Sequence, residues 1–557
     1  MNYLEKYEHW CGSPNIDEAT AHELETMKDN DQEIKERFFC DLEFGTGGLR
    51  GVIGAGTNRI NQYMIRKTTQ GYAEYIKKAG KEACERGVVI AHDNRRFSVE
   101  FARNTAGVLA ANGIKAYLFD SLRPTPELSF AVRFKKAFGG VMITASHNPP
   151  EYNGYKLYDE RGCQLVPHVN DLVVAEIEKI EDPLSVRALS LAEAGERIEI
   201  LGADVDEAYY SEVMKIVLQP KMDKSGIKIV YSPQHGTGNV PVRTVLDRLG
   251  YCVIPVEEQC TPDTEFSMTK NPNPETDDAY VLAFEYARKH DADIVITTDP
   301  DCDRLGVAVK QNGEFVRMTG NQSAAVLLEY ILSQRQAQGT LPADGVMFNT
   351  IVTSDLGDRI CESYGISVEK TLTGFKFIGD KIYGHETAGD KTFVFGYEES
   401  YGCLISDCVR DKDAVQASMM LCEAAAYYHK NGKTLMDVLH ELYAKHGFFL
   451  DALDNFVFRG LDGADQIKAL VNGLRNNPPK KAGAVTVNDM EDYTSERMLK
   501  AGFPKSNVLR FLLADGSWVA VRPSGTEPKC KFYFSVVAEN RDTAEAKLVC
   551  MRETFEK

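Results

Sequence analysis

Short segments rich in β-branched residues alternate with amphipathic helical segments along most of this chain. Such alternation predicts parallel strands joined by crossover helices, and therefore sheets covered by helices. It occurs in three successive units, and in each unit a polar loop follows a strand. Ligands of such sheets bind beyond the carboxyl ends of the strands. The expected strands are 88–92, 115–119, 140–144, 227–231, 251–255, 294–298, 345–349 and 392–395, and the expected helices cover about 98–112, 241–249 and 277–290 and begin again near 354.

The chain has 557 residues, which is too many for one hydrophobic core, so three or four domains are expected. Polar or acidic joints lie near 180–206, 312–321 and 445–451, and the tail beyond the last joint contains further strand-like segments. We therefore predict three α/β domains followed by a smaller α+β domain. Their expected bounds are 1–205, 206–320, 321–448 and 449–557.

The composition is that of a globular protein, with 43% hydrophobic and 26% charged residues. The formal net charge is −18. This charge argues against a nucleic-acid partner, because the phosphates would be repelled. It also means that a phosphorylated substrate would need a local basic pocket, since the average field opposes its approach.

The thirteen cysteines show no C-x-x-C spacing, which argues against a zinc ribbon or a thioredoxin-like motif. Free thiols in a reducing cytoplasm are the simplest account of this odd number. The N-terminal segment is polar and charged, unlike a signal peptide. No apolar run approaches the ~18 residues that span a bilayer. We therefore expect a cytoplasmic protein without a membrane partner.

The segment 145–156 directly follows the expected strand 140–144 and carries a single serine, Ser146. Its neighbour His147 can hydrogen-bond and polarise, and Pro149-Pro150 excludes a helix and stiffens the loop. A stiff polar loop that presents one serine suits a nucleophile or a phosphate carrier. An ordinary Asn-Pro turn would explain the dipeptide alone but not the whole segment.

Three aspartates, Asp299, Asp301 and Asp303, alternate on a tight loop after another expected strand. Their carboxylates can converge on one hard cation, and oxygen ligands suit Mg²⁺. An EF-hand is excluded because its sixth and twelfth positions would be Arg304 and Lys310 instead of Gly and Glu. Two alternatives stay open from the residues alone: a solvated acidic turn, and an aspartyl-phosphate enzyme with Asp299 as the nucleophile.

Two further polar loops carry chemistry. The segment 396–402 places Glu398 and Ser400 between glycines, which suits paired hydrogen bonds to sugar hydroxyls, although a polar turn would look the same. The segment 522–529 combines an arginine, hydroxyls and an exposed glycine backbone, which suits a phosphate dianion or a turn between two strands. It is not a Walker loop. Its candidate phosphate ligands are Arg522, Ser524, Gly525 and Thr526.

Together these four loops resemble those of the α-D-phosphohexomutases, the family of phosphoglucomutase and phosphomannomutase. The segment 145–156 is similar to the family's active-site serine loop. The aspartate loop resembles its D-G-D-x-D-R metal loop, with Pro300 in place of the usual glycine. The segments 396–402 and 522–529 resemble its sugar-binding and phosphate-binding loops. Tyr397 stands where many relatives have glycine.

The resemblance extends to three more segments and so covers almost the whole chain. Arg50 lies in a segment similar to the family's N-terminal arginine loop and would face the phosphoserine. Lys376 lies in a T-G-x-K loop and would lie near the reacting hydroxyl. Lys412 belongs to an element that borders the phosphate site in the family. The implied architecture is three consecutive mixed α/β/α sandwich domains and a smaller α+β domain around a central cleft.

The resemblance also implies a mechanism. The resting enzyme would carry phosphate on Ser146, and Mg²⁺ would be held by Ser146 and the three aspartates. Arg522, Ser524, Gly525 and Thr526 would hold the phosphate of the incoming sugar, while Glu398 and Ser400 fix its ring. Arg50 and Arg304 would stabilise charge or shape the site. Three candidates for the general base stay open: Lys156, Lys376 and His147.

The expected reaction is the interconversion of α-D-glucose 1-phosphate and glucose 6-phosphate, with glucose 1,6-bisphosphate as intermediate and activator. Alternatives with the same loops are a phosphomannomutase, a phosphopentomutase or a glucose 1,6-bisphosphate synthase. Alternatives from other classes are a silent sugar-phosphate sensor and an aspartyl-phosphate hydrolase. The expected partner is the sugar phosphate alone, and the expected assembly is a monomer or a homodimer.

Overall fold

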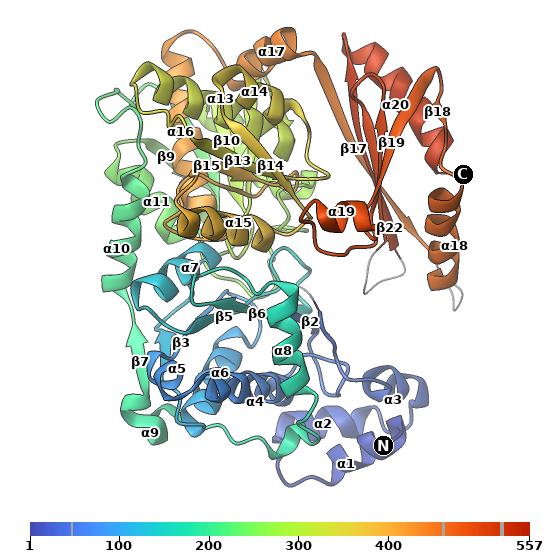
Figure 1. Cartoon of the computed structure of the whole chain (residues 1–557). Helices are drawn as coiled ribbons and strands as arrows, with labels where there is room; N and C mark the ends of the chain where they lie inside the picture. Colours follow the sequence, from blue (N-terminus) through green and yellow to red (C-terminus); the bar gives the residue numbers. More distant parts are fainter. Residues whose placement is uncertain (46–47, 459–462, 524–528, 557) are drawn as a thin grey trace. The chain divides into compact units, whose positions relative to one another are not determined.

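The computed structural model describes residues 1–45, 48–458, 463–523 and 529–556 (Figure 1). The chain forms two compact units, which are described separately. Unit 1 comprises Met1–Arg317, Gly379–Gly389 and Gly402–Tyr427, and unit 2 comprises Met318–Ile378, Asp390–Tyr401 and Tyr428–Lys557. Among the described residues, no helix is both long and apolar enough to cross a membrane.

The first sheet of unit 1 has seven strands in the order β1-β2-β6-β5-β3-β4-β7. Strands β3, β4, β5 and β7 are parallel, whereas β6 runs antiparallel to β5 and β2. Every residue of β3 and β5 is buried, as expected for parallel strands covered on both faces. The strands are β1 (Phe44–Gly45), β2 (Gly48–Val52), β3 (Val88–His92), β4 (Ala116–Phe119), β5 (Gly139–Ile143), β6 (Tyr152–Asp159) and β7 (Ile198–Leu201).

Helices α4 (Gln62–Ala79), α6 (Ser98–Ala111), α7 (Thr125–Phe134) and α8 (Pro167–Ile177) accompany this sheet. Helix α6 packs against β3 and β4, and α7 packs against β3 and β5. The side chains of α4 and α6 share one apolar core with those of the central strands. Strand β5 is therefore fixed by packing, which gives the loop after it a rigid support.

The second sheet of unit 1 has five strands in the order β12-β11-β10-β8-β9. Strand β10 is parallel to β8 and antiparallel to β11, with Thr298 opposite Leu305. The aspartate loop is therefore the turn of a β-hairpin inside a mostly buried sheet. The strands are β8 (Lys228–Ser232), β9 (Cys252–Pro255), β10 (Ile294–Thr298), β11 (Leu305–Gln311) and β12 (Glu314–Met318).

Unit 2 contains three adjacent parallel strands in the order β14-β13-β15 and a six-stranded antiparallel sheet in the order β17-β22-β21-β20-β19-β18. Side chains of α18 and α20 complete the core of the antiparallel sheet. The strands are β13 (Gly345–Thr350), β14 (Ser367–Thr371), β15 (Thr392–Tyr397), β17 (Phe448–Val457), β18 (Lys481–Ala482), β19 (Val485–Asp492), β20 (Leu509–Leu513), β21 (Trp518–Pro523) and β22 (Lys529–Ala538), and the helices include α13 (Gly320–Ala337), α14 (Leu356–Tyr364), α17 (Leu435–His446), α18 (Gly463–Asn476) and α20 (Arg541–Phe555).

The N-terminal segment folds as three helices that sequence analysis gave no expectation for. Trp10, Phe38 and Tyr63 pack edge to face in their small core. These helices are α1 (Tyr3–Gly12), α2 (Glu18–Thr26) and α3 (Asp31–Phe38).

The remaining helices and the remaining strand belong to other parts of the chain. They are α5 (Lys81–Arg86), α9 (Leu191–Ala194), α10 (Ala203–Met214), α11 (Asn239–Arg248), α12 (Val281–His290), α15 (Phe375–Ala388), α16 (Ala414–Lys430), α19 (Glu496–Lys500) and β16 (Cys403–Leu404).

Two expectations differ from the structure. The segment 145–156 is not a loop throughout, because its last five residues begin strand β6. The residues of β6 pair with those of β5, so that Lys156 lies opposite Met142. The expected helix 277–290 also divides, into a 3₁₀ turn at Asp277–Tyr280 and then α12. The predicted domain bounds stay a prediction.

Two helical glycines provide a test of packing in unit 1. A Cβ atom at Gly107 of α6 would lie 2.3 Å from the Leu189 carbonyl oxygen, whereas a Cβ at Gly384 of α15 would meet no atom within 4 Å. We expect Gly107→Ala to lower the free energy of unfolding by about 1–3 kcal/mol. We expect Gly384→Ala to raise it by up to about 1 kcal/mol, because alanine favours helix. Urea unfolding of both variants measures the difference, and equal effects would contradict the packing described here.

Candidate active site

Ser146 lies just beyond the carboxyl end of β5 in unit 1. Its backbone N–H donates to Oγ1 of Thr144 at 2.8 Å, and its φ of 53° lies in the left-handed region. This conformation costs a non-glycine residue about 1–2 kcal/mol, so the surrounding contacts must hold it. The Oγ atom is buried, and it lies 3.0 Å from Oδ2 of Asp299 and 3.2 Å from Nδ1 of His147.

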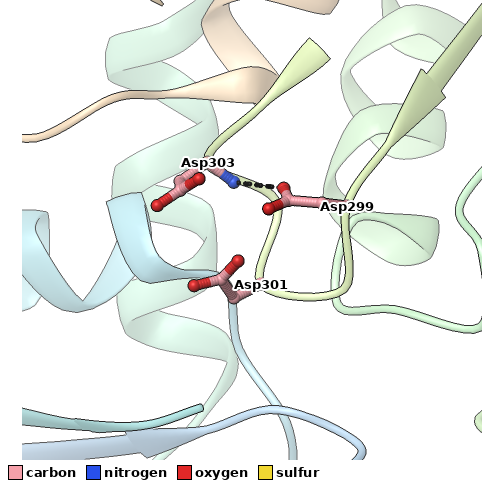
Figure 2. A group of neighbouring side chains, drawn as sticks. All are labelled: Asp299, Asp301 and Asp303. Atoms are coloured by element: carbon pink, nitrogen blue, oxygen red, sulfur yellow. Dashed lines mark hydrogen bonds between the residues drawn. The ribbon is translucent and has the colours of Figure 1, made fainter. Parts of the chain in front are cut away.

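The three aspartates gather in the turn between β10 and β11. Each offers a carboxylate oxygen within 4.8 Å of the others, and all three side chains are buried (Figure 2). Oδ1 of Asp299 accepts hydrogen bonds from the backbone N–H groups of Asp303 at 3.1 Å and Arg304 at 3.0 Å. The turn is tight because Cys302, at its centre, has a φ of 54°. Ser146 and the aspartate loop, 153 positions apart in the chain, thus meet in one site.

Two oxygens of this cluster that accept no hydrogen bond from a described residue fit a metal ion. Oδ1 of Asp301 and Oδ1 of Asp303 are buried and have no hydrogen-bond partner among the described residues. The second oxygen of each of these two carboxylates faces an ammonium group: Nζ of Lys156 lies 2.8 Å from Oδ2 of Asp301, and Nζ of Lys412 lies 3.1 Å from Oδ2 of Asp303. Buried carboxylate oxygens without partners are costly unless a cation coordinates them. The triad can therefore bind a hard metal ion.

The pKa values of Asp299 and Asp301 are shifted in opposite directions. Burial, together with the carboxylates of Asp301 and Asp303, raises the pKa of Asp299 well above its ordinary value. Burial alone would also raise the pKa of Asp301, but the ammonium group of Lys156 outweighs it and holds that pKa below the ordinary range. Of these two carboxyl groups, that of Asp299 therefore retains a proton more readily in the metal-free site.

His147 and two arginines surround the serine. Burial lowers the pKa of His147 well below its ordinary value, and the guanidinium groups of Arg304 and Arg50 lower it further. The imidazole is therefore neutral at pH 7 and can accept a proton. Arg50 is exposed on β2, and its Nη1 donates to Oδ1 of Asn148 at 3.0 Å. Arg304 forms an ion pair with Glu275.

In unit 2 the structure brings Glu398 together with the loop before Lys376. Oε1 of Glu398 accepts a hydrogen bond of 2.7 Å from the backbone N–H of Gly374, whose φ of 120° suits glycine. The Glu398 and Lys376 side chains are both buried, whereas Ser400 is half-buried. Tyr397 is fully buried, and its hydroxyl donates to the Ser354 carbonyl, so its side chain belongs to the core and not to a ligand surface.

The expected phosphate cradle is described only in part. Arg522 is half-buried on β21. Ser524, Gly525 and Thr526 lie outside the described residues. The structure thus neither joins these three residues to the other candidates nor separates them.

Sequence reasoning missed residues that hold the two loops from outside. Thr125, the first residue of α7, donates its hydroxyl to Oδ2 of Asp301 at 3.1 Å and its N–H to the Asp301 carbonyl at 2.9 Å. Both the N–H and the hydroxyl of Thr237 donate to the Pro300 carbonyl. Arg95 contacts the serine loop. A signal was available, since each of these residues follows the carboxyl end of a parallel strand.

Comparison with known proteins places these features in a family. Models of the phosphoglucomutase/phosphomannomutase alpha/beta/alpha domains I, II and III match residues 41–183, 207–313 and 319–446, and the model of the C-terminal domain matches residues 470–554. The chain is therefore an α/β phosphohexomutase of four consecutive domains. It belongs to the phosphoglucomutase/phosphomannomutase family and is an enzyme, which confirms the predicted fold class.

Individual relatives agree with this membership. The chain is 37% identical to a phosphoglucomutase of Staphylococcus haemolyticus, over 91% of this chain and 92% of the relative, and 36% identical to one of Staphylococcus aureus strain MSSA476, over 98% of each. A crystal structure of a putative phosphomannomutase from Thermus thermophilus is similar with a TM-score of 0.69 and 26% identity, over 93% of this chain and 100% of that chain. Parafusin, a phosphoglucomutase from Paramecium, shares the fold with a TM-score of 0.71 and 18% identity, over 93% of this chain and 95% of that chain.

Substitution within the triad tests the metal site. We expect Asp301→Asn to weaken Mg²⁺ binding at least about tenfold, because a neutral amide replaces a charged ligand. Isothermal titration calorimetry measures the affinity. Asp291→Asn is the matched control, since Asp291 is an exposed acid that pairs with Lys310. Equal affinities in both variants would contradict the proposed ligand set.

The raised pKa of Asp299 predicts that metal binding releases a proton. Protonated Asp299 cannot act as an anionic ligand, so Mg²⁺ affinity should rise with pH as this carboxyl ionises and should fall as pH is lowered below its raised pKa. Calorimetry at a series of pH values, each in two buffers of different ionisation enthalpy, counts the released protons. A heat of binding that is the same in both buffers would contradict a protonated Asp299.

Proposed function

We propose that this enzyme is a phosphoglucomutase that interconverts α-D-glucose 1-phosphate and glucose 6-phosphate through a phosphoserine at Ser146. The observation that carries the proposal is the placement of the Ser146 hydroxyl 3.0 Å from Asp299 within a buried carboxylate triad. The choice of glucose rests on the staphylococcal relatives, which are named phosphoglucomutase. Glucose 1,6-bisphosphate would be the intermediate and the activator.

Phosphoryl transfer needs a carrier oxygen and charge stabilisation. In the proposal Ser146 is the carrier, and its constrained backbone keeps Oγ at one position. Asp299, Asp301 and Asp303, with a phosphoryl oxygen on Ser146, would hold Mg²⁺, which when bound neutralises charge on the transferred group. Lys412 and Arg304 add positive charge beside the triad.

Two protons must move in each half-reaction. The imidazole of His147 lies 3.2 Å from Ser146 Oγ and is neutral in this site. It can return a proton to the serine oxygen as the phosphoryl group leaves only after it has first taken up a proton. The attacking sugar hydroxyl needs a base, and Lys156 and Lys376 are both candidates. Lys156 already donates to Asp301, so it acts as a base only if it first loses its proton. The pH dependence of kcat in Lys156→Met and Lys376→Met separates the two.

Roles for the remaining residues follow the family resemblance. Glu398 and Ser400 would bind sugar hydroxyls. Arg522, Ser524, Gly525 and Thr526 would bind the phosphate that is not being transferred. Lys412 would bind substrate from an element that borders the phosphate site, and Arg50 would stabilise the phosphoserine.

The setting of the enzyme is part of the proposal. All thirteen cysteines are free thiols, which is consistent with a reducing cytoplasm. The proposed partner is the sugar phosphate, without nucleic acid or membrane, and a monomer or homodimer would suffice. The domain bounds proposed are 1–205, 206–320, 321–448 and 449–557.

Substrate choice is tested by phosphorus NMR of the enzyme with Mg²⁺ and a trace of glucose 1,6-bisphosphate. Glucose, mannose and ribose 1-phosphates are supplied separately. We expect rapid conversion of the glucose ester to glucose 6-phosphate. Faster conversion of the mannose or ribose ester would reassign the enzyme to that sugar. Conversion of none would exclude a mutase for these sugars and favour a bisphosphate synthase, a hydrolase or a sensor.

The carrier role is tested by Ser146→Ala. We expect its kcat to fall below about a thousandth of the wild-type value, since the variant lacks the oxygen that carries the phosphoryl group in this proposal. Ser225→Ala, which alters an exposed serine bonded to Asp223, is the control and should keep full activity. Substantial turnover by Ser146→Ala would end this mechanism.

A further inference from the structure

We propose that Arg95 is the positioning residue of the phosphate carrier: its guanidinium group gathers the backbone carbonyls of the serine loop and so fixes the direction of the Ser146 hydroxyl. The inference rests on the proposed function, because it assigns a role in the phosphoryl transfer of Ser146. It concerns a residue that follows β3 and that none of the loop resemblances includes.

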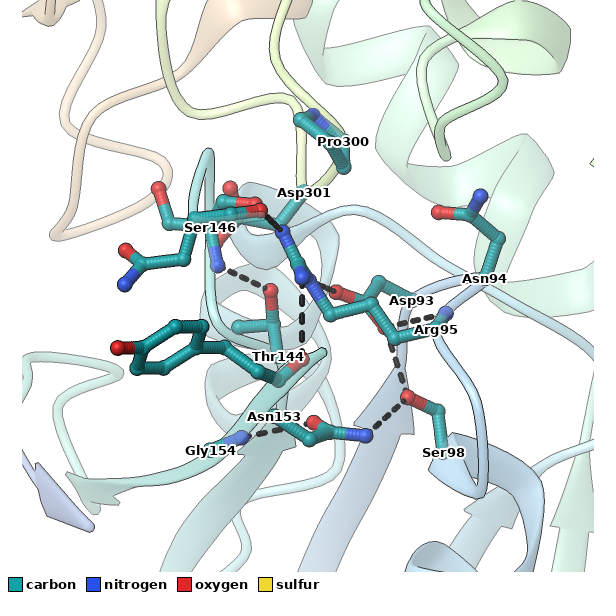
Figure 3. Close-up of polar contacts among 12 residues, drawn as sticks. Asp93, Asn94, Arg95, Ser98, Thr144, Ser146, Asn153, Gly154, Pro300 and Asp301 are labelled. Carbon is teal, nitrogen blue, oxygen red and sulfur yellow. Dashed lines mark hydrogen bonds and ion pairs between the residues drawn. The ribbon is translucent and has the colours of Figure 1, made fainter. Parts of the chain in front are cut away.

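The guanidinium group makes four hydrogen bonds to one loop. Nη2 donates to the carbonyl oxygens of Ser146 at 2.6 Å and Asn148 at 2.5 Å. Nη1 donates to the carbonyl oxygens of Pro149 at 2.8 Å and Tyr152 at 3.0 Å. Figure 3 shows the side chain reaching from the loop after β3 toward Ser146. One planar group therefore ties together both ends of the segment from Ser146 to Tyr152.

Arg95 is itself held from behind. Its backbone N–H donates to Oδ1 of Asp93 at 2.9 Å, and its Nε lies 3.2 Å from Oδ2 of the same carboxylate. Oδ1 of Asp93 also accepts a bond from the Ser98 hydroxyl at 2.8 Å, and the Ser98 oxygen accepts one from Asn153 at 3.0 Å. The guanidinium carbon lies 5.1 Å from the centre of the Phe266 ring. The four hydrogen bonds from Arg95 to the serine loop, called the clamp below, are thus part of a connected buried network (Figure 3).

The side chains of Arg95 and Asp93 are wholly buried. Arg95 therefore cannot contact a sugar phosphate in this conformation, and its effect must pass through the loop. Ser146 has a left-handed backbone, which persists only if its surroundings enforce it. The bond from Arg95 to the Ser146 carbonyl and the bond from the Ser146 N–H to Thr144 fix the two peptide groups that flank this residue.

The clamp also orients the next peptide group. The Ser146–His147 peptide is trans, so its N–H points away from the side on which its carbonyl meets Arg95. Arg95 thus determines on which side of the loop both Oγ and this N–H are presented. A lysine could not replace it, because an ammonium group lacks the planar fork that reaches four carbonyls at once.

The test compares Arg95→Lys and Arg95→Ala with Arg96→Ala as the matched control. Arg96 is the adjacent arginine, but its side chain is exposed and pairs with Glu265. We expect kcat to fall about 10²-fold in both Arg95 variants, as for a displaced reacting group, while KM for the sugar phosphate stays within about twofold. Low, non-denaturing guanidinium should restore part of the kcat of Arg95→Ala and leave that of Arg95→Lys unchanged.

Two further measurements keep the outcome decisive. Melting curves show whether each variant folds. If Arg95→Ala does not fold, Asp93→Asn takes its place as the test variant. It keeps the guanidinium group but weakens its support, so its kcat should fall by less than about 10²-fold. Hydrogen exchange of the amides within 145–152 should rise in Arg95→Lys and not in Arg96→Ala, whatever the activity. Inactive wild-type enzyme would refute the proposed function, and unchanged exchange would refute the clamp. Two results with an active wild type would overturn the positioning role. The first is a folded Arg95→Lys whose kcat equals that of the wild type. The second is an Arg95→Ala that loses kcat and sugar affinity equally and is not rescued by guanidinium.

Discussion

The concentration of negative charge in the turn between β10 and β11 constrains the rest of this site. Three carboxylates lie buried with oxygens within 4.8 Å of one another. At an effective dielectric constant of about 20, two such charges repel by roughly 3–4 kcal/mol. The turn can therefore be stable only with neighbouring cations, a retained proton or a bound metal ion. In the metal-free site the neighbouring cations are Lys156 and Lys412. The raised pKa of Asp299 favours the retained proton.

The fold provides those neighbours through strand pairing. Because β6 returns antiparallel beside β5, Lys156 comes back to the level of the serine loop and reaches Asp301. The same return places Tyr152 where its carbonyl meets Arg95. Thr125 at the start of α7 and Thr237 after β8 hold the aspartate loop from two other directions. The chemistry of the loops thus depends on backbone hydrogen bonds made by residues with no chemical role of their own.

The sequence was sufficient for the features that depend on local pattern. The buried strands β3 and β10, the aspartate turn and the polar loops after strands follow from residue type and spacing alone. It was not sufficient for Arg95, Thr125 or the course of β6, because their importance arises from contacts with segments far away in the chain. The three N-terminal helices were not predicted for a related reason, since their core includes the contact between Trp10 and Tyr63 of α4, which is distant in the chain. The roles of individual site residues stay predictions, as do the domain bounds.

The central claim is that Ser146 carries the phosphoryl group. The most direct measurement is mass-spectrometric mapping of the phosphate on wild-type enzyme after incubation with glucose 1,6-bisphosphate and Mg²⁺. The account predicts one phosphoryl group per chain, on Ser146, which is stable in acid. If the bisphosphate is isotopically labelled in its phosphates, excess unlabelled glucose 1-phosphate should move the label from Ser146 into product while the serine stays phosphorylated. An alkali-labile phosphate on Asp299, or a chain that takes up no phosphate while it still turns over substrate, would contradict it.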